Sequence, residues 1–197
     1  MHLLQFLIKK NSSKKTNIII DLLQDKERVL DFGCGDLSFT NLLWEKNKSL
    51  DITAIDVVDF KKRVRGIKFV LYDGKKLPFS ANTFDTVISY YVLHHTNDAL
   101  KYFEEFIRVS KKRIILVESV ARHSIEFPGM KFMDWIFNIW KPEAIALTYQ
   151  FKTYDEWKNL FEKYKLKIVS DIDAEIMPIP KFFPVGRSHM FVLEKNK

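Results

Sequence analysis

The chain has 197 residues, of which 47% are hydrophobic and 14% aromatic, so it can bury the core of one globular domain and is not disordered. Its single cysteine, Cys34, excludes an internal disulfide and a multi-cysteine metal site. The apolar stretch within Met1–Lys10 is too short for a signal peptide, and no run approaches the ~20 apolar residues of a membrane span. These features predict a soluble, cytoplasmic protein.

The first predicted elements frame a glycine turn. Helices are predicted over Leu3–Lys10 and Thr16–Gln24, followed by a short buried strand, Arg28–Phe32, that stops at Gly33 and Gly35. Glycine at both positions allows a sharp backbone turn and lets a ligand approach the main chain without meeting a Cβ atom. A strand, a glycine turn and the helix that follows predict a cradle whose free N–H groups face a nucleotide-like ligand.

The residues around the glycines discriminate between two kinds of cofactor. A dinucleotide site has a third glycine three residues after the second, where this chain has Ser38. Asp31 stands shortly before the first glycine, and a carboxylate there would repel a pyrophosphate but attract an ammonium group. The spacing Asp31-x-Gly33-x-Gly35 therefore favours a ligand that carries a positive amine.

Acidic residues also end the next two predicted strands. The apolar run Ile52–Ile55 ends in Asp56, and the run Ile67–Tyr72 ends in Asp73-Gly74. A carboxylate at the tip of the second strand is placed to accept both hydroxyls of a ribose. A fourth strand, Phe84–Ser89, is followed by the run Tyr90-Tyr91-Val92-Leu93-His94-His95.

This series of strand ends, within residues 28–118, resembles the class I S-adenosylmethionine-dependent methyltransferases, in particular their small-molecule branch. The resemblance implies S-adenosylmethionine as cofactor and S-adenosylhomocysteine as product, with Asp56 at the ribose and Asp73 at the adenine amino group. An ordinary α/β domain with aspartates in its turns is the alternative. The cofactor-binding residues that the resemblance implies are Asp31, Phe32, Gly33, Cys34, Gly35, Asp56, Val57, Tyr72, Asp73, Gly74, Ser89 and Tyr90.

The chain departs from the family pattern at Leu37, where members usually have a further glycine. A side chain there is expected either to narrow the approach to the methionine moiety or to turn away into the helix. Cys34, between the two glycines, is interpreted as a small filler and not as a nucleophile.

The rest of the chain alternates helices and strands, which predicts a parallel sheet covered on both faces. The predicted elements are a helix over Asn97–Val109 capped by Asn97 or Thr96, a strand over Arg113–Glu118, a helix over Tyr154–Tyr164, and strands over Leu166–Ser170 and His189–Leu193. The resemblance implies an α/β, Rossmann-like fold whose seven-stranded, mostly parallel sheet has the order 3-2-1-4-5-7-6, with the last strand antiparallel. We divide the single domain into an N-terminal helical cap (1–25), a cofactor-binding core (28–118), an aromatic-rich insertion (119–152) and C-terminal strands (153–197).

The insertion has two interpretations. Between Met130 and Trp140, apolar residues cover almost the whole circumference of a helix, so a single core face does not account for them. These residues form either a satellite core beneath a long loop or a lid whose second face lines an apolar substrate pocket. The segment leaves a strand at its carboxyl end, where ligands bind in such sheets.

Methyl transfer from a sulfonium depends mainly on positioning, so no obvious catalytic constellation is expected. His94 and His95, at the rim where the methyl group should emerge, are the candidate bases for a hydroxyl or acidic-carbon acceptor. A structural role, as a loop cap or in packing on the cofactor, is the competing interpretation. The scattered histidines predict no metal site.

The leading functional hypothesis is a methyltransferase that acts on a small, partly apolar metabolite. The net charge of +7, with the densest basic cluster at Lys61–Arg65, motivates an alternative, a tRNA or rRNA methyltransferase. The chain lacks the Asn/Asp-Pro-Pro-Tyr tetrad that often grips a nucleobase amine, which counts against part of that alternative. A cofactor-binding, non-catalytic scaffold is the third hypothesis. The expected partner is a small-molecule substrate, and no oligomeric state follows from the sequence.

Overall fold

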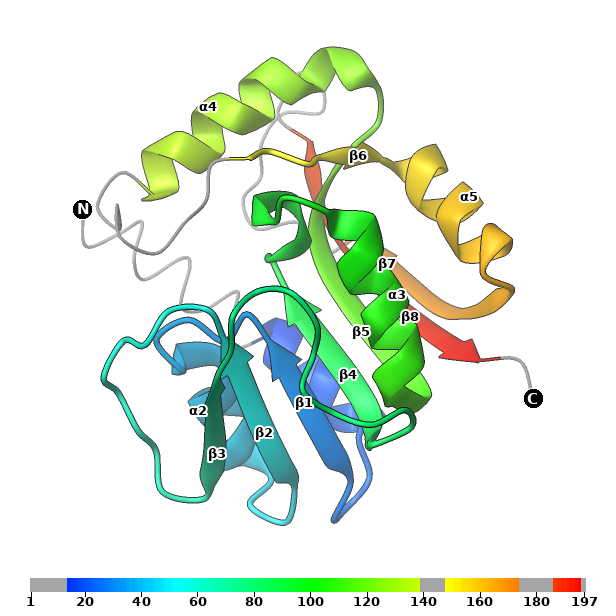
Figure 1. Ribbon diagram of the computed structural model, residues 1–197. Helices are drawn as coiled ribbons and strands as arrows, with labels where there is room; N and C mark the ends of the chain where they lie inside the picture. The colour runs from blue at the N-terminus through cyan, green and yellow to red at the C-terminus, as the bar shows by residue number, and fades with distance from the viewer. Residues whose placement is uncertain (1–13, 139–147, 174–185, 196–197) are drawn as a thin grey trace.

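The protein is described by a computed structural model that covers residues 14–138, 148–173 and 186–195. Its strands form one sheet in the order β3-β2-β1-β4-β5-β8-β7, with the short β6 paired with the end of β5 (Figure 1). β8 runs antiparallel to both of its neighbours. The strands are β1 (Arg28–Phe32), β2 (Asp51–Asp56), β3 (Ile67–Leu71), β4 (Phe84–Tyr90), β5 (Ser110–Ala121), β6 (Lys152–Thr153), β7 (Leu166–Asp173) and β8 (Arg187–Lys195). With β6 left out of the count, this is the expected order 3-2-1-4-5-7-6, and the predicted fold class is confirmed.

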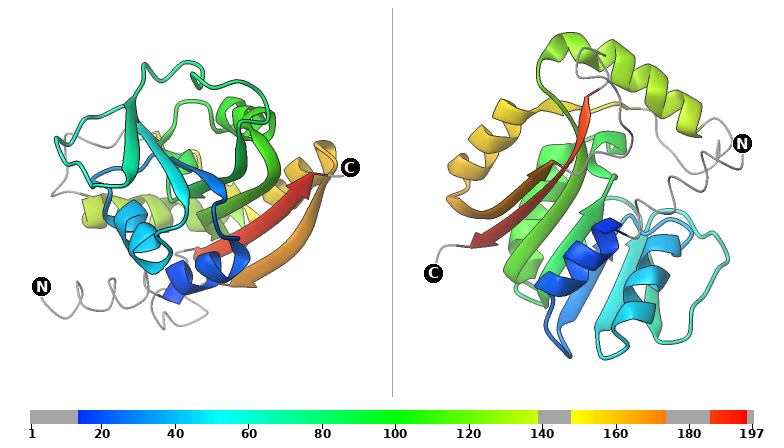
Figure 2. Two further views of the ribbon diagram at one scale, coloured as in Figure 1. Left: turned by 90° about the horizontal axis from the view of Figure 1, so that it is seen from below. Right: turned by 180° about the vertical axis from the view of Figure 1, so that it is seen from behind.

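Helices cover both faces of the sheet (Figures 1 and 2). α3 (Ala99–Val109) and α5 (Tyr154–Lys163) lie on one face, whereas α2 (Ser38–Lys46) and the helix over residues 14–22 lie on the other. α4 (Phe127–Asn138) lies above the carboxyl ends of the parallel strands. Two short 3-10 turns, Leu93–His95 and Ser124–Glu126, follow β4 and β5. None of the described helices combines the length and apolarity that crossing a membrane requires.

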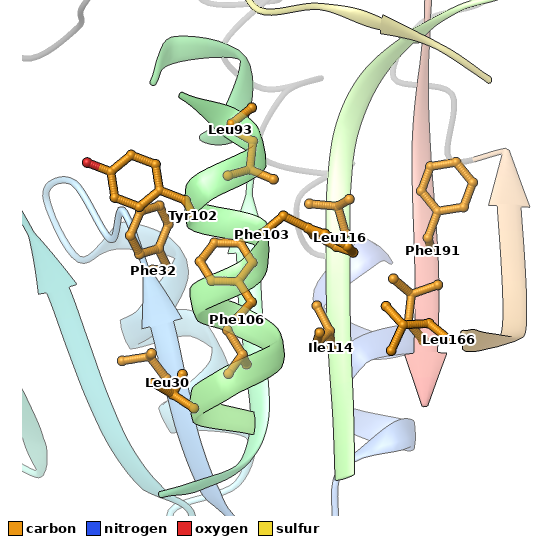
Figure 3. Close-up of a cluster of buried hydrophobic side chains, with 14 of the residues drawn as sticks. Leu30, Phe32, Leu93, Tyr102, Phe103, Phe106, Ile114, Leu116, Leu166 and Phe191 are labelled. Carbon is orange, nitrogen blue, oxygen red and sulfur yellow. The ribbon is translucent and has the colours of Figure 1, made fainter. Parts of the chain in front are cut away.

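Each face of the sheet has its own apolar core. Phe103 and Phe106 of α3 pack with Leu30 and Leu116 of the central strands (Figure 3). On the opposite face, Ile19 packs in a second cluster with residues of α2 and of the strands. Strands that are covered on both sides read as continuous apolar runs, which is why β5, with its run Ile114–Val117, was recognisable in the sequence.

The element boundaries differ from the sequence predictions mainly at the ends. The first described helix covers residues 14–22 and not Thr16–Gln24, and the predicted helix Leu3–Lys10 lies outside the described residues. β5, β7 and β8 each extend beyond the predicted apolar runs, because polar residues at their ends still pair with neighbouring strands. α5 ends one residue earlier than expected, at Lys163.

The predicted cap of α3 was wrong. The helix begins at Ala99, and the Asp98 side chain accepts a hydrogen bond from the Lys101 backbone N–H (3.0 Å). Thr96 instead donates from Oγ1 to the Leu93 carbonyl (2.7 Å), which closes the preceding 3-10 turn. A carboxylate two residues downstream of Thr96 therefore takes the capping role that the hydroxyl was expected to take.

α4 has one buried side and one exposed side. Met130 is buried with Ala121 and Phe151 in a small satellite cluster. Phe132 and Trp135, by contrast, are 59% and 45% exposed. A satellite core thus accounts for part of this helix only, and the predicted residues Ile139 and Trp140 lie outside the described residues.

Candidate functional site

The glycine turn after β1 is shaped by two positive φ angles. Gly33 has φ +71°, and a Cβ atom there would lie 2.4 Å from Val92 Cγ1, so the loop after β4 requires glycine at this position. The N–H groups of Gly33 and Cys34 donate to the Ile55 carbonyl (2.8 and 3.2 Å). Gly35 has φ +52°, but a Cβ atom there would meet nothing within 4 Å. The turn is therefore tied to β2 at its start and open above Gly35.

Leu37 turns into the protein and not toward the opening. It has φ +63°, in the left-handed region that glycine adopts at lower cost, which explains the glycine of the family pattern. Its side chain is only 2% exposed and packs with Cys34 and Ala54. The second of the two expectations for this position therefore holds. Burial raises the pKa of the Cys34 thiol, which is consistent with a packing role.

Asp31 of β1 is buried, with 1% of its surface exposed. Burial raises the pKa of its carboxyl group to about 7, and the nearby Asp56 carboxylate adds to the rise. The hydrogen bond that Thr40 Oγ1 donates to Asp31 Oδ2 (2.5 Å) lowers this pKa but does not offset burial. The charged form of such a carboxyl group lacks the solvation that it has in water. A cationic ligand group beside Asp31 would restore that stabilisation.

Asp56 at the tip of β2 is buried and already holds two backbone groups. Its Oδ2 accepts a hydrogen bond from Gly35 N–H (2.7 Å), and its Oδ1 accepts one from Val58 N–H (3.0 Å). The same carboxylate that was expected to meet a ribose thus fixes the glycine turn. Each carboxylate oxygen has two lone pairs, so both can accept a further hydrogen bond.

The turns after β2 and β3 lie side by side. A Cβ atom on Gly74 would lie 3.4 Å from Val57 Cγ1, and Tyr102 OH donates to the Gly74 carbonyl. The Asp73 side chain is 63% exposed and pairs with Lys75 (3.6 Å). Asp73 therefore stands at the rim, whereas Asp31 and Asp56 lie beneath it in the interior.

Several other predicted cofactor residues have side chains in the core. Phe32 is 2% exposed and packs edge-on against Tyr72 (6.3 Å between ring centroids), so only its backbone can meet a ligand at the turn. Ser89 is fully buried, and its Oγ has no hydrogen-bond partner among the described residues. Tyr90 stacks on Phe39 of α2 (4.3 Å between centroids).

His94 and His95 lie together after β4, under α4. Their ring centroids are 4.0 Å apart, and the Nε2 atoms of His94 and His95 lie 3.6 and 3.5 Å from Asp134 Oδ1 of α4. On its other side, His94 Nδ1 is hydrogen-bonded to Glu118 Oε2 of β5 (2.5 Å). Phe151 stacks on the His94 ring at 5.0 Å. The two histidines therefore face a carboxylate that the sequence interpretation did not include.

Glu118 organises the loop that carries the histidines. It is 1% exposed, and its Oε1 accepts hydrogen bonds from the backbone N–H groups of Val92 (3.1 Å) and Leu93 (2.8 Å). Burial on its own would lower the pKa of His94, but the Glu118 charge, together with Asp134, outweighs this and raises the pKa to about 9. Glu118 and Asp134 therefore stabilise the protonated form of His94.

A second buried polar cluster lies on the opposite side of the β4 loop. Lys15 is only 2% exposed, and its Nζ donates to Tyr91 OH and to Ser188 Oγ (2.7 Å). Burial lowers the pKa of Lys15 to about 7.

Two nearby acids, Asp59 and Asp36, offset part of the charge of the basic cluster at Lys61–Arg65. Lys61 and Arg63 both pair with Asp59 (3.1 and 2.9 Å), and Lys62 pairs with Asp36 (3.6 Å). Three of its four cations thus have an acidic partner, which weakens the case for an RNA-binding surface here.

Three functional candidates were missed in the sequence for identifiable reasons. Glu118 ends an apolar run and was taken only as a strand boundary. Asp134 is the single acidic residue of a strongly apolar helix, and such an isolated charge is the signal that would have identified it. Lys15 follows another lysine, so the pattern favours exposure for both.

A family model described as a methyltransferase domain matches residues 30–117, a segment that contains the glycine turn, Asp56, Asp73 and both histidines. The demethylmenaquinone methyltransferase of Thermotoga maritima is 26% identical over 136 residues, which are 66% of this chain and 59% of that protein. The chain therefore spans less than two-thirds of the length of this curated relative.

Solved structures share the fold. A SAM-dependent methyltransferase from Aquifex aeolicus has a TM-score of 0.60 at 16% identity, covering 91% of this chain and 88% of that one. The 1,6-didemethyltoxoflavin-N1-methyltransferase of Burkholderia thailandensis, solved with S-adenosylhomocysteine, has a TM-score of 0.64 at 16% identity, covering 94% and 79%. Residues 30–117 therefore match the methyltransferase domain family, and the fold of the described residues is similar to that of solved S-adenosylmethionine-dependent methyltransferases.

Proposed function

We propose that this chain transfers the methyl group of S-adenosylmethionine to a small, partly apolar acceptor. The observation that carries the proposal is the buried Asp31 carboxyl group beside a glycine turn that is open above Gly35. Burial has raised the pKa of Asp31 to about 7, so a cationic amine docked there gains a carboxylate that water does not screen. A pyrophosphate at the same place would meet a repulsive charge.

The residues present fit the cofactor. In this proposal Asp31 binds the amino group, Asp56 accepts the ribose hydroxyls, and Asp73 with Gly74 meets the adenine at the rim. Gly33–Gly35 supply close backbone approach, and Tyr90 closes the side toward β4. When bound, S-adenosylmethionine supplies a methyl group that its sulfonium already activates.

What the protein must add is position, exclusion of water and, for some acceptors, removal of a proton. His94 and His95 are the proposed catalytic residues on the acceptor side. Glu118 and Asp134 raise the pKa of His94 and so favour its protonated form. Phe151, stacked on His94, gives the acceptor side an aromatic wall.

The relatives support a small acceptor. The Thermotoga protein is named for demethylmenaquinone, and the Burkholderia structure contains 1,6-didemethyltoxoflavin; both are small molecules. Asp59 and Asp36 offset two of the three positive charges of Lys61–Arg63, which reduces the charge that this cluster offers to a nucleic acid. We therefore infer a small acceptor from the part of the site that contains His94 and His95, and we do not infer a nucleic acid from a basic surface.

The test compares two aspartates at opposite ends of β2. Asp56→Ala removes an acceptor of two ribose hydrogen bonds, each worth roughly 1.5–3 kcal/mol to a charged group, so affinity for S-adenosylhomocysteine should fall more than ~100-fold by calorimetry. Asp51→Ala, at the amino end, where the side chain is 69% exposed, should leave the affinity unchanged. Equal affinities in both variants would contradict the assignment of Asp56.

The acceptor is tested by following S-adenosylhomocysteine release against pools of small ring compounds and against tRNA. Turnover with small acceptors and none with RNA is the expected result. Turnover with RNA alone would replace the proposal with the RNA hypothesis, and cofactor binding without any turnover would favour a scaffold. A folded protein that binds neither S-adenosylmethionine nor S-adenosylhomocysteine would refute the proposed function altogether.

A further inference from the structure

Three side chains from two distant segments converge under α4. His94 and His95 follow β4, and Asp134 lies in α4; one potential ligand atom from each lies within 4.8 Å of the other two. Within the described parts of the chain, this is the one group of three His, Cys, Asp or Glu side chains that converges in this way. By comparison, His189 also lies near a carboxylate, that of Asp171 (3.3 Å), but without a third ligand.

The spacing of these atoms suits a tetrahedral ion. Bonds of ~2.0–2.1 Å from zinc to imidazole nitrogen and carboxylate oxygen place neighbouring ligand atoms ~3.4 Å apart. Asp134 Oδ1 lies 3.6 Å from His94 Nε2 and 3.5 Å from His95 Nε2. An ion would therefore need only small side-chain adjustments to contact all three.

The surroundings fix one ligand in the orientation that a metal requires. Glu118 Oε2 is hydrogen-bonded to His94 Nδ1 (2.5 Å), which places the Nδ1 proton on that side and leaves Nε2 directed to Asp134. A histidine that binds a metal usually donates its other N–H to a carboxylate in this way. Glu118 is itself held by the backbone N–H groups of Val92 and Leu93, so the His94 ring has little freedom to turn away.

The local charge also favours a dication. Two carboxylates, Glu118 and Asp134, lie beside two imidazoles in a site where the His94 side chain is 4% exposed and the Asp134 side chain 14% exposed. With neutral imidazoles, a divalent ion balances the two negative charges. The partial exposure of Asp134 and His95 leaves a path for entry.

We propose that His94, His95 and Asp134 bind a divalent transition-metal ion, with zinc as the best match, through His94 Nε2, His95 Nε2 and one Asp134 oxygen. Two imidazoles and one carboxylate are ligands that zinc, iron(II) and cobalt(II) share. Three protein ligands leave one tetrahedral position open, and that position is available to water or to an oxygen of the acceptor. In the metal-bound protein the two imidazoles are ligands and not bases, so a water in the open position would accept the proton instead. Glu118 acts as the positioning residue for His94.

The proposal is tested on the full-length, untagged chain after treatment with a chelator, in the absence of cofactor and acceptor. Zinc titrated by calorimetry should bind one ion per chain, and cobalt(II) should give the visible absorption of a tetrahedral site. His95→Ala and Asp134→Asn should each weaken zinc binding by more than ~100-fold. This exceeds the ~10–100-fold loss that typically follows mutation of a residue that only orients a metal ligand. His189→Ala and His123→Ala, on histidines outside the cluster, should bind zinc as the wild type does.

Glu118→Gln tests whether Glu118 positions His94 without binding the metal itself. It should keep one ion per chain but weaken zinc ~10–100-fold. Circular dichroism and S-adenosylhomocysteine binding establish that each variant is folded, and they also report on the proposed function independently of the metal. Absence of zinc and cobalt binding to the folded wild type would overturn the proposal, as would full-strength binding that survives both His95→Ala and Asp134→Asn.

Discussion

Replacing Asp31 by asparagine should stabilise the ligand-free protein while weakening cofactor binding. Asparagine has the shape of the protonated carboxyl group and its Oδ1 still accepts a hydrogen bond from Thr40, but it carries no charge to desolvate. Wild-type Asp31 is 1% exposed, and its folded-state pKa is raised from 3.8 to about 7. The carboxyl group that is proposed to bind the amine therefore destabilises the fold whenever it is ionised.

The sign and size of the effect follow from proton linkage. Between pH 3.8 and 7 the folded state holds a proton that the unfolded state has released, so wild-type stability falls as the pH rises. About three pH units at 1.36 kcal/mol per unit give a penalty of as much as ~4 kcal/mol above pH 7. The advantage of Asp31→Asn should therefore be small near pH 4, about 1–2 kcal/mol at pH 5 and largest at pH 8.

Urea denaturation of both proteins at pH 5 and pH 8, with equal m-values, measures this difference. Calorimetry with S-adenosylhomocysteine at the same two pH values should show wild-type affinity rising toward pH 8 and a weaker, flatter response in Asp31→Asn. Asp51→Asn, which changes an exposed carboxylate on the neighbouring strand, serves as the control. If Asp31→Asn is less stable than the wild type at pH 8, or gains equally at both pH values, the reasoning fails.

Two further predictions concern the glycine turn and the buried Lys15 of the helix over residues 14–22. Gly33→Ala should destabilise the protein by roughly 2 kcal/mol or more, because the new Cβ atom would lie 2.4 Å from Val92 Cγ1 at a positive φ. Gly35→Ala, with open space above it, should cost only about 1 kcal/mol of stability. Equal losses of stability in thermal denaturation would contradict this geometry. Lys15→Met should change the pH dependence of stability. Burial lowers the pKa of Lys15 to about 7, so between pH 7 and 10.5 this lysine binds fewer protons in the folded state than in the unfolded state. The stability of the wild type should therefore rise from pH 7 to 9. An equal rise in the stability of Lys15→Met would show that Lys15 is not its source.

The proposed donor side of the site could be located in the sequence because its residues follow the strand pattern. Asp31 and Asp56 each stand at the end of an apolar run, and parallel strands bring their carboxyl ends to one edge. Two such residues, with glycines between them, are enough to predict that β1 and β2 are parallel neighbours and that the glycine turn lies at their carboxyl ends. Leu37 could be placed only by the structure, since its left-handed backbone directs the side chain inward.

The proposed acceptor side could be located only in part from the sequence, because it depends on contacts between distant segments. His94 and His95 were identified from their place after β4, but Asp134 comes from a helix whose periodicity is almost uniformly apolar. No spacing rule connects residue 94 with residue 134. Glu118 and Lys15 were missed for a related reason: burial of a charged side chain is decided by the partners that tertiary structure supplies.

The position of α4 has a consequence for how such a protein diversifies. The helix reaches the histidines from a stretch of chain that shares no residue with the glycine turn or with the aspartates of β1 and β2. A chimera in which residues 122–138 are replaced by those of a relative should therefore change its acceptor specificity and retain its affinity for S-adenosylmethionine. Under the proposed function, selection on this one short segment would change the acceptor and leave the proposed cofactor contacts in place.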